Sequence, residues 1–298
     1  MSIAGNVGLP DLPRICPLIS RRVQRSMNAE ESRIVAVRTV RFGDVRPVVI
    51  AGPCAVESFE QTLAIARAVK DVGAEMLRGG AFKPRTSPHD FQGLGMEGLR
   101  ILREVSRETG LPIVTEVMDP RLVETVCEYA DMLQIGSRNM QNYPLLIEAG
   151  KSGKPVLLKR GMAASLCEWL GAAEYLAKEG NLDVVLCERG IKAFPSGEYS
   201  RNVLDLSVIS AVKEETFLPV IVDPSHATGV AGMVESASCA AIASGSHGLI
   251  IEVACDYPGA AKPRCDAVQA ISPAALANIV RFIDMRMEHF ALRKAHAI

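Results

Sequence analysis

Eight short apolar runs in this chain each stop at a residue that could bind an anion or a metal ion, or transfer a proton. The residues at the ends of these runs are Cys54, Lys83, Glu116, Arg138, Lys159, Arg189, His226 and Glu252. Three of them, Arg138, Lys159 and Arg189, are cations that would repel one another unless an anion joined them. A phosphate monoester is the expected partner, because guanidinium groups bind phosphate with paired hydrogen bonds. The alternative is that each cation pairs with a nearby carboxylate, such as Glu188 or Glu168.

A second cationic group surrounds the second run. Arg78, Lys83 and Arg85 are followed by Thr86, whose hydroxyl adds a hydrogen-bond donor. Prolines on both sides of the Arg-Thr-Ser segment stiffen the loop, which lowers the entropy lost when a ligand is held. Two separate anion-binding groups predict two phosphorylated substrates.

The ends of three other runs combine a thiol, an imidazole and a carboxylate. Cys54, His226 and Glu252 would be neighbours if the first, seventh and eighth runs lay side by side, and Asp266 could complete four ligands. Mixed soft and hard ligands suit a divalent metal such as Mn, Fe, Co or Zn. The alternatives are an inert buried cysteine, a core histidine and a glutamate paired with a lysine. The chain has no CxxC or HExxH motif that would decide between them.

Two further acids have open roles. Glu116 could orient a water molecule or accept a proton, or it could form a salt bridge with one of the cations. Asp223 could hold His226 or take part in catalysis.

The elements that must position these residues alternate along the chain. Each apolar run has the length of a strand and is followed by a stretch of helical length, so strand and helix alternate eight times. This pattern predicts a (β/α)8 TIM barrel, in which the active site forms at the carboxyl ends of the strands. Helices are expected near residues 58–72, 92–108, 120–129, 142–151, 164–179, 202–214, 230–244 and 273–294.

The predicted domain organisation is a barrel over residues 47–298 after a short N-terminal extension, residues 1–46. Within the extension, the alternating segment 34–44 predicts a strand or hairpin that caps the barrel floor. The total of 298 residues fits one barrel, and 48% hydrophobic residues with only 5% aromatic residues fit buried parallel strands.

Composition also excludes several classes of function. A net charge of -1 argues against nucleic-acid binding, which needs a basic excess. No apolar run reaches the roughly 18 to 20 residues that cross a membrane. Cysteines placed inside apolar patterns, without a preceding signal peptide, favour a cytoplasmic location.

The motifs resemble a known family. The strings IAGPCAVES, LRGGAFKPRTSPHDFQGLG, TEVMD, LQIGSRNMQN, LLKRGM, LCERGI and IVDPSHATG are similar to those of the 3-deoxy-D-arabino-heptulosonate 7-phosphate (DAHP) synthases of the short microbial type, type I beta. The resemblance runs from about residue 47 to residue 252. Related 3-deoxy-octulosonate 8-phosphate synthases share the barrel but usually carry Lys-Ala-Asn-Arg-Ser where this chain has Lys83 to Ser87, which reads KPRTS. This difference favours erythrose 4-phosphate over arabinose 5-phosphate as the acceptor.

The resemblance implies a reaction and a role for each site residue. Phosphoenolpyruvate, erythrose 4-phosphate and water would give DAHP and phosphate, the first step of the shikimate pathway to the aromatic amino acids. The residues implied as ligands of a divalent metal are Cys54, His226, Glu252 and Asp266. Those implied to bind the phosphate of phosphoenolpyruvate are Arg138, Lys159 and Arg189. Those implied to bind the aldose phosphate are Arg85, Thr86 and Arg201.

The remaining implied roles concern the reacting atoms. Arg78 and Lys83 would face the carboxylate and the reacting carbons of phosphoenolpyruvate, with Lys83 a candidate proton donor to the aldehyde oxygen. Glu116 would help to place the water molecule. The family also implies a homo-oligomer, a dimer or a tetramer. Because the chain shows none of the added domains that bind feedback inhibitors, we expect an enzyme insensitive to aromatic amino acids.

The chain departs from the family pattern after Glu252. Ala254 and Cys255 stand where the family commonly has His-Pro, the following loop is longer, and Asp256 is a rival of Asp266 as a metal ligand. Alternatives are the same chemistry on another aldose phosphate, such as arabinose 5-phosphate or a specialised-metabolite sugar, and a non-catalytic barrel that binds a phosphorylated ligand. An aldolase that forms a Schiff base would need a desolvated lysine without a neighbouring arginine.

Overall fold

The computed structural model describes residues 22–23, 32–193, 201–257, 265 and 267–296. Most of the predicted N-terminal extension, the loop before Arg201 and the candidate ligand Asp266 lie outside these residues.

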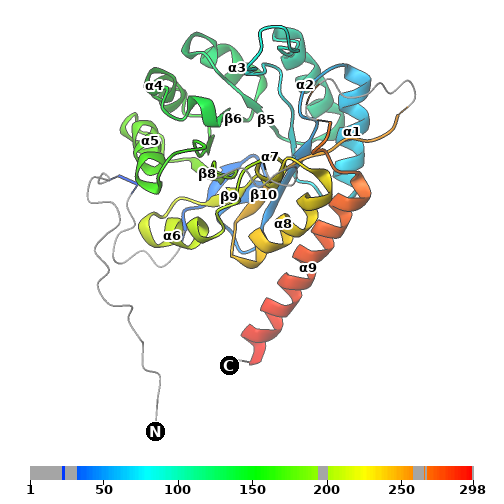
Figure 1. Ribbon diagram of the computed structural model, residues 1–298, viewed down its shortest axis with the longest axis vertical. Coiled ribbons are helices and arrows are strands. Elements are labelled where there is room, and N and C mark those ends of the chain that lie inside the picture. The colour runs from blue at the N-terminus through cyan, green and yellow to red at the C-terminus, as the bar shows by residue number, and fades with distance from the viewer. Residues whose placement is uncertain (1–21, 24–31, 194–200, 258–264, 266, 297–298) are drawn as a thin grey trace.

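Eight parallel strands close into a barrel (Figure 1). The strands are β3 (Val48–Gly52), β4 (Met76–Arg78), β5 (Ile113–Glu116), β6 (Met132–Ile135), β7 (Val156–Lys159), β8 (Val184–Glu188), β9 (Val220–Val222) and β10 (Gly248–Glu252). Each pairs with the next along the chain, and β10 closes the barrel by pairing with β3 through Gly248 to Glu252. The predicted (β/α)8 barrel is therefore confirmed.

Helices surround the strands. They are α1 (Phe59–Asp71), α2 (Met96–Thr109), α3 (Val123–Tyr129), α4 (Tyr143–Lys151), α5 (Leu166–Lys178), α6 (Ser207–Glu215), α7 (Pro224–Thr228), α8 (Ala231–Ala243) and α9 (Pro273–His296). Short 3-10 turns, η1 (Pro120–Leu122) and η2 (Ser137–Asn139), precede α3 and α4. The hydroxyl of Ser58 accepts a hydrogen bond from the backbone N–H of Gln61 at 3.1 Å, so Ser58 caps α1.

Two predicted helices begin later than expected. The helix predicted over 92–108 starts at Met96, because Gly93 and Gly95 adopt positive φ angles of 90° and 59°, which are incompatible with a right-handed helix. The helix predicted over 202–214 starts at Ser207. Asp205, two residues before this start, accepts a hydrogen bond from the backbone N–H of Val208 at 3.2 Å.

The barrel interior follows the two-residue period of the strands. Side chains at alternate positions point inward and form a cluster of buried residues that includes Val48, Ile50, Met76, Val114, Met132, Leu157, Val185, Cys187, Ile221 and Ile250. The strands β1 (Val35–Val37) and β2 (Val40–Phe42) form an antiparallel hairpin whose apolar residues join the same cluster. This confirms that the segment 34–44 caps the barrel floor.

The same alternation places polar groups at the other end of the barrel. The strand residues two positions beyond the interior cluster are Arg78, Glu116, Gln134, Lys159 and Glu252, and all of them are buried. Apolar packing therefore fills the floor and the middle of the barrel, and ionisable side chains form its upper layer.

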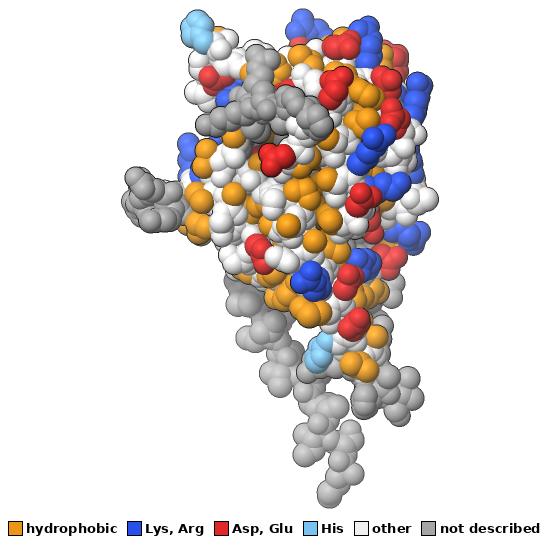
Figure 2. All heavy atoms as spheres, turned by 90° about the vertical axis from the view of Figure 1, so that its right-hand side faces the viewer, with side chains coloured by type: hydrophobic (Ala, Val, Ile, Leu, Met, Phe, Trp, Pro, Cys, Tyr) orange, Lys and Arg blue, Asp and Glu red, His pale blue; other side chains and the backbone are white. Residues whose placement is uncertain are grey.

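The outer surface is mixed in character. Helix α9 packs against α8 and α1, and its C-terminal part extends past the barrel (Figure 1). The face on this side shows hydrophobic side chains among neighbouring basic and acidic ones (Figure 2). Within the described residues, no helix combines the length and the apolar character that a membrane crossing requires.

Candidate active site

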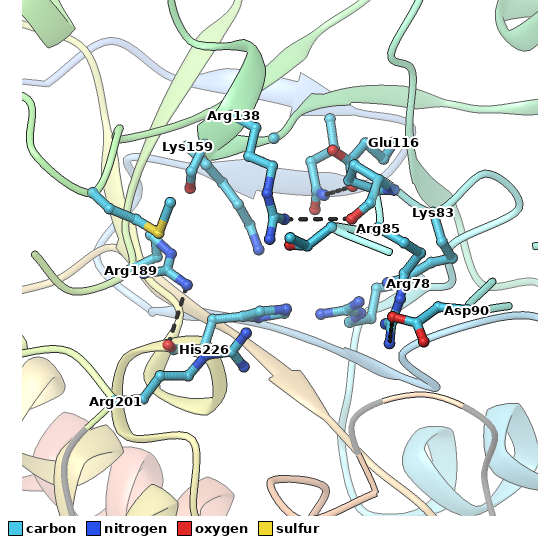
Figure 3. Close-up of a pocket in the computed structure, with 16 residues that line it drawn as sticks. Arg78, Lys83, Arg85, Asp90, Glu116, Arg138, Lys159, Arg189, Arg201 and His226 are labelled. Atoms are coloured by element: carbon cyan, nitrogen blue, oxygen red, sulfur yellow. Dashed lines mark hydrogen bonds and ion pairs between the residues drawn. The ribbon is translucent and has the colours of Figure 1, made fainter. Parts of the chain in front are cut away.

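A cavity of about 180 Å³ opens at the carboxyl ends of the strands. All of the predicted substrate-binding and proton-transferring residues line it, together with His226. Figure 3 shows Arg138, Lys159 and Arg189 on one side of the cavity and the Arg78, Lys83 and Arg85 group on the other. The structure thus brings together cations that the sequence places far apart, and both groups face the same space.

The first group of cations is only partly neutralised by protein carboxylates. Lys159 forms a buried ion pair with Asp223. Arg138 instead donates to the carbonyl oxygen of Pro84 at 3.4 Å, and Arg189 donates to the carbonyl oxygen of His226 at 3.2 Å. Among the described contacts of these three cations, only Lys159 pairs with a carboxylate, as the alternative expected.

The two carboxylates that were considered as partners have other roles. Glu188 lies 3.0 Å from Arg160, and Glu168 forms a capping box with Ser165 at the start of α5. A phosphate group would thus meet guanidinium groups whose described partners are neutral carbonyl oxygens.

The second group of cations is buried at the base of the cavity. Arg78 lies 3.1 Å from Glu252 Oε1, while its Nε and Nη1 atoms are buried without a hydrogen-bond partner. Lys83 Nζ donates to the carbonyl oxygen of Cys54 at 3.0 Å and lies 3.1 Å from its Sγ. Buried donors without partners cost free energy, so this region is suited to an anionic ligand such as a carboxylate.

The protonation state of Lys83 follows from its neighbours. Burial alone would lower its pKa, but the thiol groups of Cys54 and Cys265 raise the pKa above its usual range. A lysine that forms a Schiff base needs the opposite shift, because the free amine is the nucleophile. A charged ammonium group at Lys83 therefore does not fit the Schiff-base alternative.

His226 and Glu252 form the part of the site that fits a metal ion best. Burial lowers the pKa of His226 and keeps the imidazole neutral, while Nδ1 lies 2.7 Å from Asp223 Oδ2. Burial would raise the pKa of Asp223, but His226 and Lys159 hold it well below its usual range. An ionised carboxylate only accepts hydrogen bonds, so we assign the proton to Nδ1.

The lone pair of His226 Nε2 then faces another acceptor. Glu252 Oε1 lies 3.4 Å from Nε2 and 3.1 Å from Arg78 Nη2, and no hydrogen bond to this buried oxygen is described. Protein-bound metal ions commonly have a histidine ligand whose other ring nitrogen donates a hydrogen bond to a carboxylate. His226 has this arrangement, and its Nε2 and Glu252 Oε1 present electron pairs toward each other. The donor set therefore fits a divalent cation.

The other two predicted ligands are not placed in the same way. Cys54 Sγ lies 3.0 Å from Cys265 Sγ, and over the described part of the chain no three His, Cys, Asp or Glu side chains form a group able to hold a metal. Asp266 follows Cys265 directly but lies outside the described residues. Its rival Asp256 is exposed and is absent from the cavity lining.

Glu116 is buried on β5 and lies at the edge of the cavity. Its Oε2 accepts a hydrogen bond from Gln134 Nε2 at 3.4 Å, and within the described residues Glu116 forms no ion pair, so the alternative of a salt bridge is not found there. Burial raises the pKa of Glu116, although Lys83 and Lys159 partly oppose the shift. Gly136 packs so closely against Glu116 Oε1 that a Cβ would overlap this atom.

Two glutamines belong to the site but were missed by sequence reasoning. Gln134 could have been found, because it lies two positions after the interior residue Met132 on β6. Gln269 lies in the segment between β10 and α9, where no periodicity marks it, and donates to Glu252 Oε2 at 2.6 Å.

The comparisons with known proteins agree with this geometry. The model of the DAHP synthetase I family matches residues 26–289. The chain belongs to the DAHP synthetase I family. The earlier resemblance to DAHP synthases is thereby confirmed.

Individual members of the DAHP synthetase I family and its relatives can be compared directly. A phospho-2-dehydro-3-deoxyheptonate aldolase of Thermotoga maritima is 44% identical over 249 residues, which cover 84% of this chain and 72% of the relative. A 2-dehydro-3-deoxyphosphooctonate aldolase of Syntrophotalea carbinolica is 37% identical over 254 residues, or 79% of this chain and 89% of the relative.

Solved structures give the same result. The crystal structure of the Thermotoga maritima DAHP synthase superposes with a TM-score of 0.82 at 42% identity and covers 91% of this chain and 77% of that one. A truncated form of the Thermotoga maritima enzyme gives a TM-score of 0.80 at 40% identity and covers 91% of this chain and 96% of that one.

Proposed function

We propose that this protein condenses phosphoenolpyruvate with erythrose 4-phosphate and water to form DAHP and phosphate. The observation that carries the proposal is the single cavity with two opposed groups of cations, in a chain of the DAHP synthetase I family. Two phosphorylated substrates that react with each other need two anion sites that face one space. The 44% identical relative, a phospho-2-dehydro-3-deoxyheptonate aldolase, supports the seven-carbon product.

Phosphoenolpyruvate occupies the deeper part of the cavity in this proposal. Its phosphate lies among Arg138, Lys159 and Arg189, and its carboxylate meets Arg78, whose Nε and Nη1 are buried without partners. The aldose phosphate binds Arg85, Thr86 and Arg201, which line the same cavity. Holding both reactants in this way replaces a bimolecular encounter with an oriented complex.

Lys83 and Glu116 move the protons of the reaction. The raised pKa of Lys83 keeps its ammonium group charged, so that it can donate a proton to the aldehyde oxygen as the new carbon–carbon bond forms. The raised pKa of Glu116 suits it to accept a proton from the water that adds to C2 of phosphoenolpyruvate. Loss of phosphate then gives the 2-keto group of the product.

A divalent cation such as Mn, Fe, Co or Zn, held by His226 and Glu252 with Cys54 and Asp266 as further ligands, would polarise the aldehyde as a Lewis acid. His226 Nε2 and Glu252 Oε1 support this proposal because both present electron pairs to one point. We also propose a homo-oligomer, a dimer or a tetramer, which light scattering after size exclusion would establish.

The test is phosphate release from phosphoenolpyruvate, measured after chelator treatment and again with Mn²⁺. We expect turnover with erythrose 4-phosphate that returns when Mn²⁺ is added, and little turnover with arabinose 5-phosphate. The Lys83→Met variant should bind phosphoenolpyruvate but turn over about 10² to 10⁴ times more slowly. Absence of turnover with erythrose 4-phosphate in the metal-loaded protein would overturn the proposed function.

A further inference from the structure

Gln269 connects two parts of the site that have different roles in the proposed reaction. Its side chain is 2% exposed. The amide oxygen accepts a hydrogen bond from Arg201 Nη1 at 3.0 Å, and the amide nitrogen donates to Glu252 Oε2 at 2.6 Å. One neutral side chain therefore bridges a predicted aldose-phosphate ligand and a predicted metal ligand.

The chemistry of the two partners fixes the orientation of this amide. Arginine has donors only, so it must bind the oxygen of Gln269. Glu252 forms an ion pair with Arg78 at 3.1 Å, and its carboxylate accepts hydrogen bonds, so it must bind the nitrogen. A flipped amide would place two donors together at Arg201 and two acceptors together at Glu252.

The bond to Gln269 determines which oxygen of Glu252 is available. Oε2 accepts the hydrogen bond from the amide nitrogen, whereas Oε1 accepts no described hydrogen bond and lies 3.4 Å from His226 Nε2 and 3.1 Å from Arg78 Nη2. Because Glu252 is completely buried, water cannot take the place of the amide. Gln269 thus keeps Oε1 directed toward the point where His226 presents its lone pair.

The other bond acts on Arg201, an exposed residue at the cavity edge. A long exposed side chain samples many rotamers, and ordering it on ligand binding costs conformational entropy. The hydrogen bond from Arg201 to Gln269 restricts this freedom before the ligand arrives. Gly229 also lies against the stem of Arg201, since a Cβ there would come within 2.9 Å of Arg201 Cβ.

We propose that Gln269 is a positioning residue that orients Glu252 toward the metal position and Arg201 toward the acceptor phosphate. The acceptor half of this inference rests on the proposed function. Loss of Gln269 should therefore weaken binding of the metal and of the aldose phosphate together. Arg138 and Lys159, which bind the phosphate of phosphoenolpyruvate in the proposed function, should stay in place.

Two variants separate the two hydrogen bonds. Gln269→Met keeps the length of the side chain but makes neither bond. Gln269→Glu keeps an acceptor for Arg201 but loses the N–H donor to Glu252 and places a second carboxylate beside that residue. Gln141→Met is the matched control, because Gln141 is exposed and lies outside the active-site cavity.

Mn²⁺ affinity by calorimetry and the KM values of both substrates are the measurements. For Gln269→Met we expect Mn²⁺ affinity to fall about 10- to 100-fold, the KM for erythrose 4-phosphate to rise, and the KM for phosphoenolpyruvate to stay within twofold. For Gln269→Glu we expect a near-normal KM for erythrose 4-phosphate and a weaker Mn²⁺ affinity than that of the wild type.

Two results would overturn the inference. One is unchanged Mn²⁺ affinity and unchanged acceptor KM in Gln269→Met. The other is an equal rise in the KM values of both substrates together with a lower melting temperature, which would indicate a structural role. If the wild-type protein does not use erythrose 4-phosphate, the proposed function fails, but Mn²⁺ calorimetry of Gln269→Met still decides whether Gln269 orients Glu252.

Discussion

Asp223 Oδ2 lies 2.7 Å from Nδ1 of His226, and the same oxygen pairs with the ammonium group of Lys159. The carboxylate is completely buried at the end of β9. The sequence left open whether Asp223 holds His226 or serves catalysis. The structure shows that it holds His226, and that it also connects the candidate metal position with the cations of the phosphate site.

Asp223→Asn should therefore impair both stability and metal binding. The substitution leaves the buried Lys159 without a counter-charge, which costs about 3 to 5 kcal/mol in free energy of unfolding. It also allows the imidazole of His226 to change tautomer, so Mn²⁺ affinity should fall about 10- to 100-fold. Urea denaturation and calorimetry measure the two effects, and a loss of stability below about 1 kcal/mol would contradict the importance of the buried pair.

The raised pKa of Glu116 predicts how stability depends on pH. Between the pKa of the unfolded chain, about 4.3, and the higher pKa of the folded state, the native protein binds a proton that the unfolded chain has released. Stability therefore decreases as pH rises through this interval.

Glu116→Gln removes this contribution to the pH dependence. The melting temperature of Glu116→Gln minus that of the wild type should be constant below about pH 4 and should increase as the pH rises. A difference that stays flat from pH 4 to pH 8 would show that Glu116 keeps an ordinary pKa. Because Glu116 lines the cavity, the same variant should also lose activity.

Gly136→Ala should inactivate the enzyme through Glu116. The backbone at Gly136 has φ -69° and ψ 159°, which alanine adopts readily, so only the overlap with Glu116 Oε1 opposes the substitution. We expect a fall in kcat of about 100-fold or more, as for loss of a proton-transferring group.

The effect of Gly136→Ala should be much smaller when Glu116→Ala is already present, because the clash is gone. Gly171→Ala is the matched control. Gly171 lies within α5 with open space around its Cβ position, so alanine there should leave activity unchanged and raise stability by about 0.5 to 1 kcal/mol. Equal loss of activity in both backgrounds would exclude Glu116 as the cause.

The thiols of Cys54 and Cys265 predict sensitivity to oxidation. Their sulfur atoms lie 3.0 Å apart. The hydrogen bond with Cys265 and burial raise the pKa of Cys54, so we expect the reactive thiolate at Cys265, where Arg85 Nη1 lies 2.8 Å from Sγ and a cation favours ionisation. Hydrogen peroxide would remove one hydrogen from each thiol, form a disulfide and be reduced to two water molecules.

We expect peroxide to inactivate the enzyme and dithiothreitol to restore it, with a mass loss of two hydrogens that maps to Cys54 and Cys265. Cys265→Ser should prevent the reversible inactivation, whereas Cys239→Ser, on α8, should not. Reversible inactivation that persists unchanged in Cys265→Ser would assign the sensitivity to another thiol.

The sequence by itself determined the barrel and most of the residues at its mouth. Strand periodicity is local, so a run such as PVLLK predicts both that residues 155–159 form a buried strand and that Lys159 stands at its carboxyl end. The hairpin over 34–44 was predictable for the same reason. The start of α2 was not, because the positive φ angles of Gly93 and Gly95 belong to the loop between β4 and α2, whose earlier residues line the cavity.

Only the tertiary structure decided which of these residues act on one another. Lys159 and Asp223 are 64 positions apart, and Cys54 and Cys265 are 211 apart. Gln269 meets both Arg201 and Glu252 without any periodic signal. These contacts arise because closure of the barrel brings the ends of non-consecutive strands to one mouth, where burial and charge select the partners. Sequence spacing contains no measure of that closure.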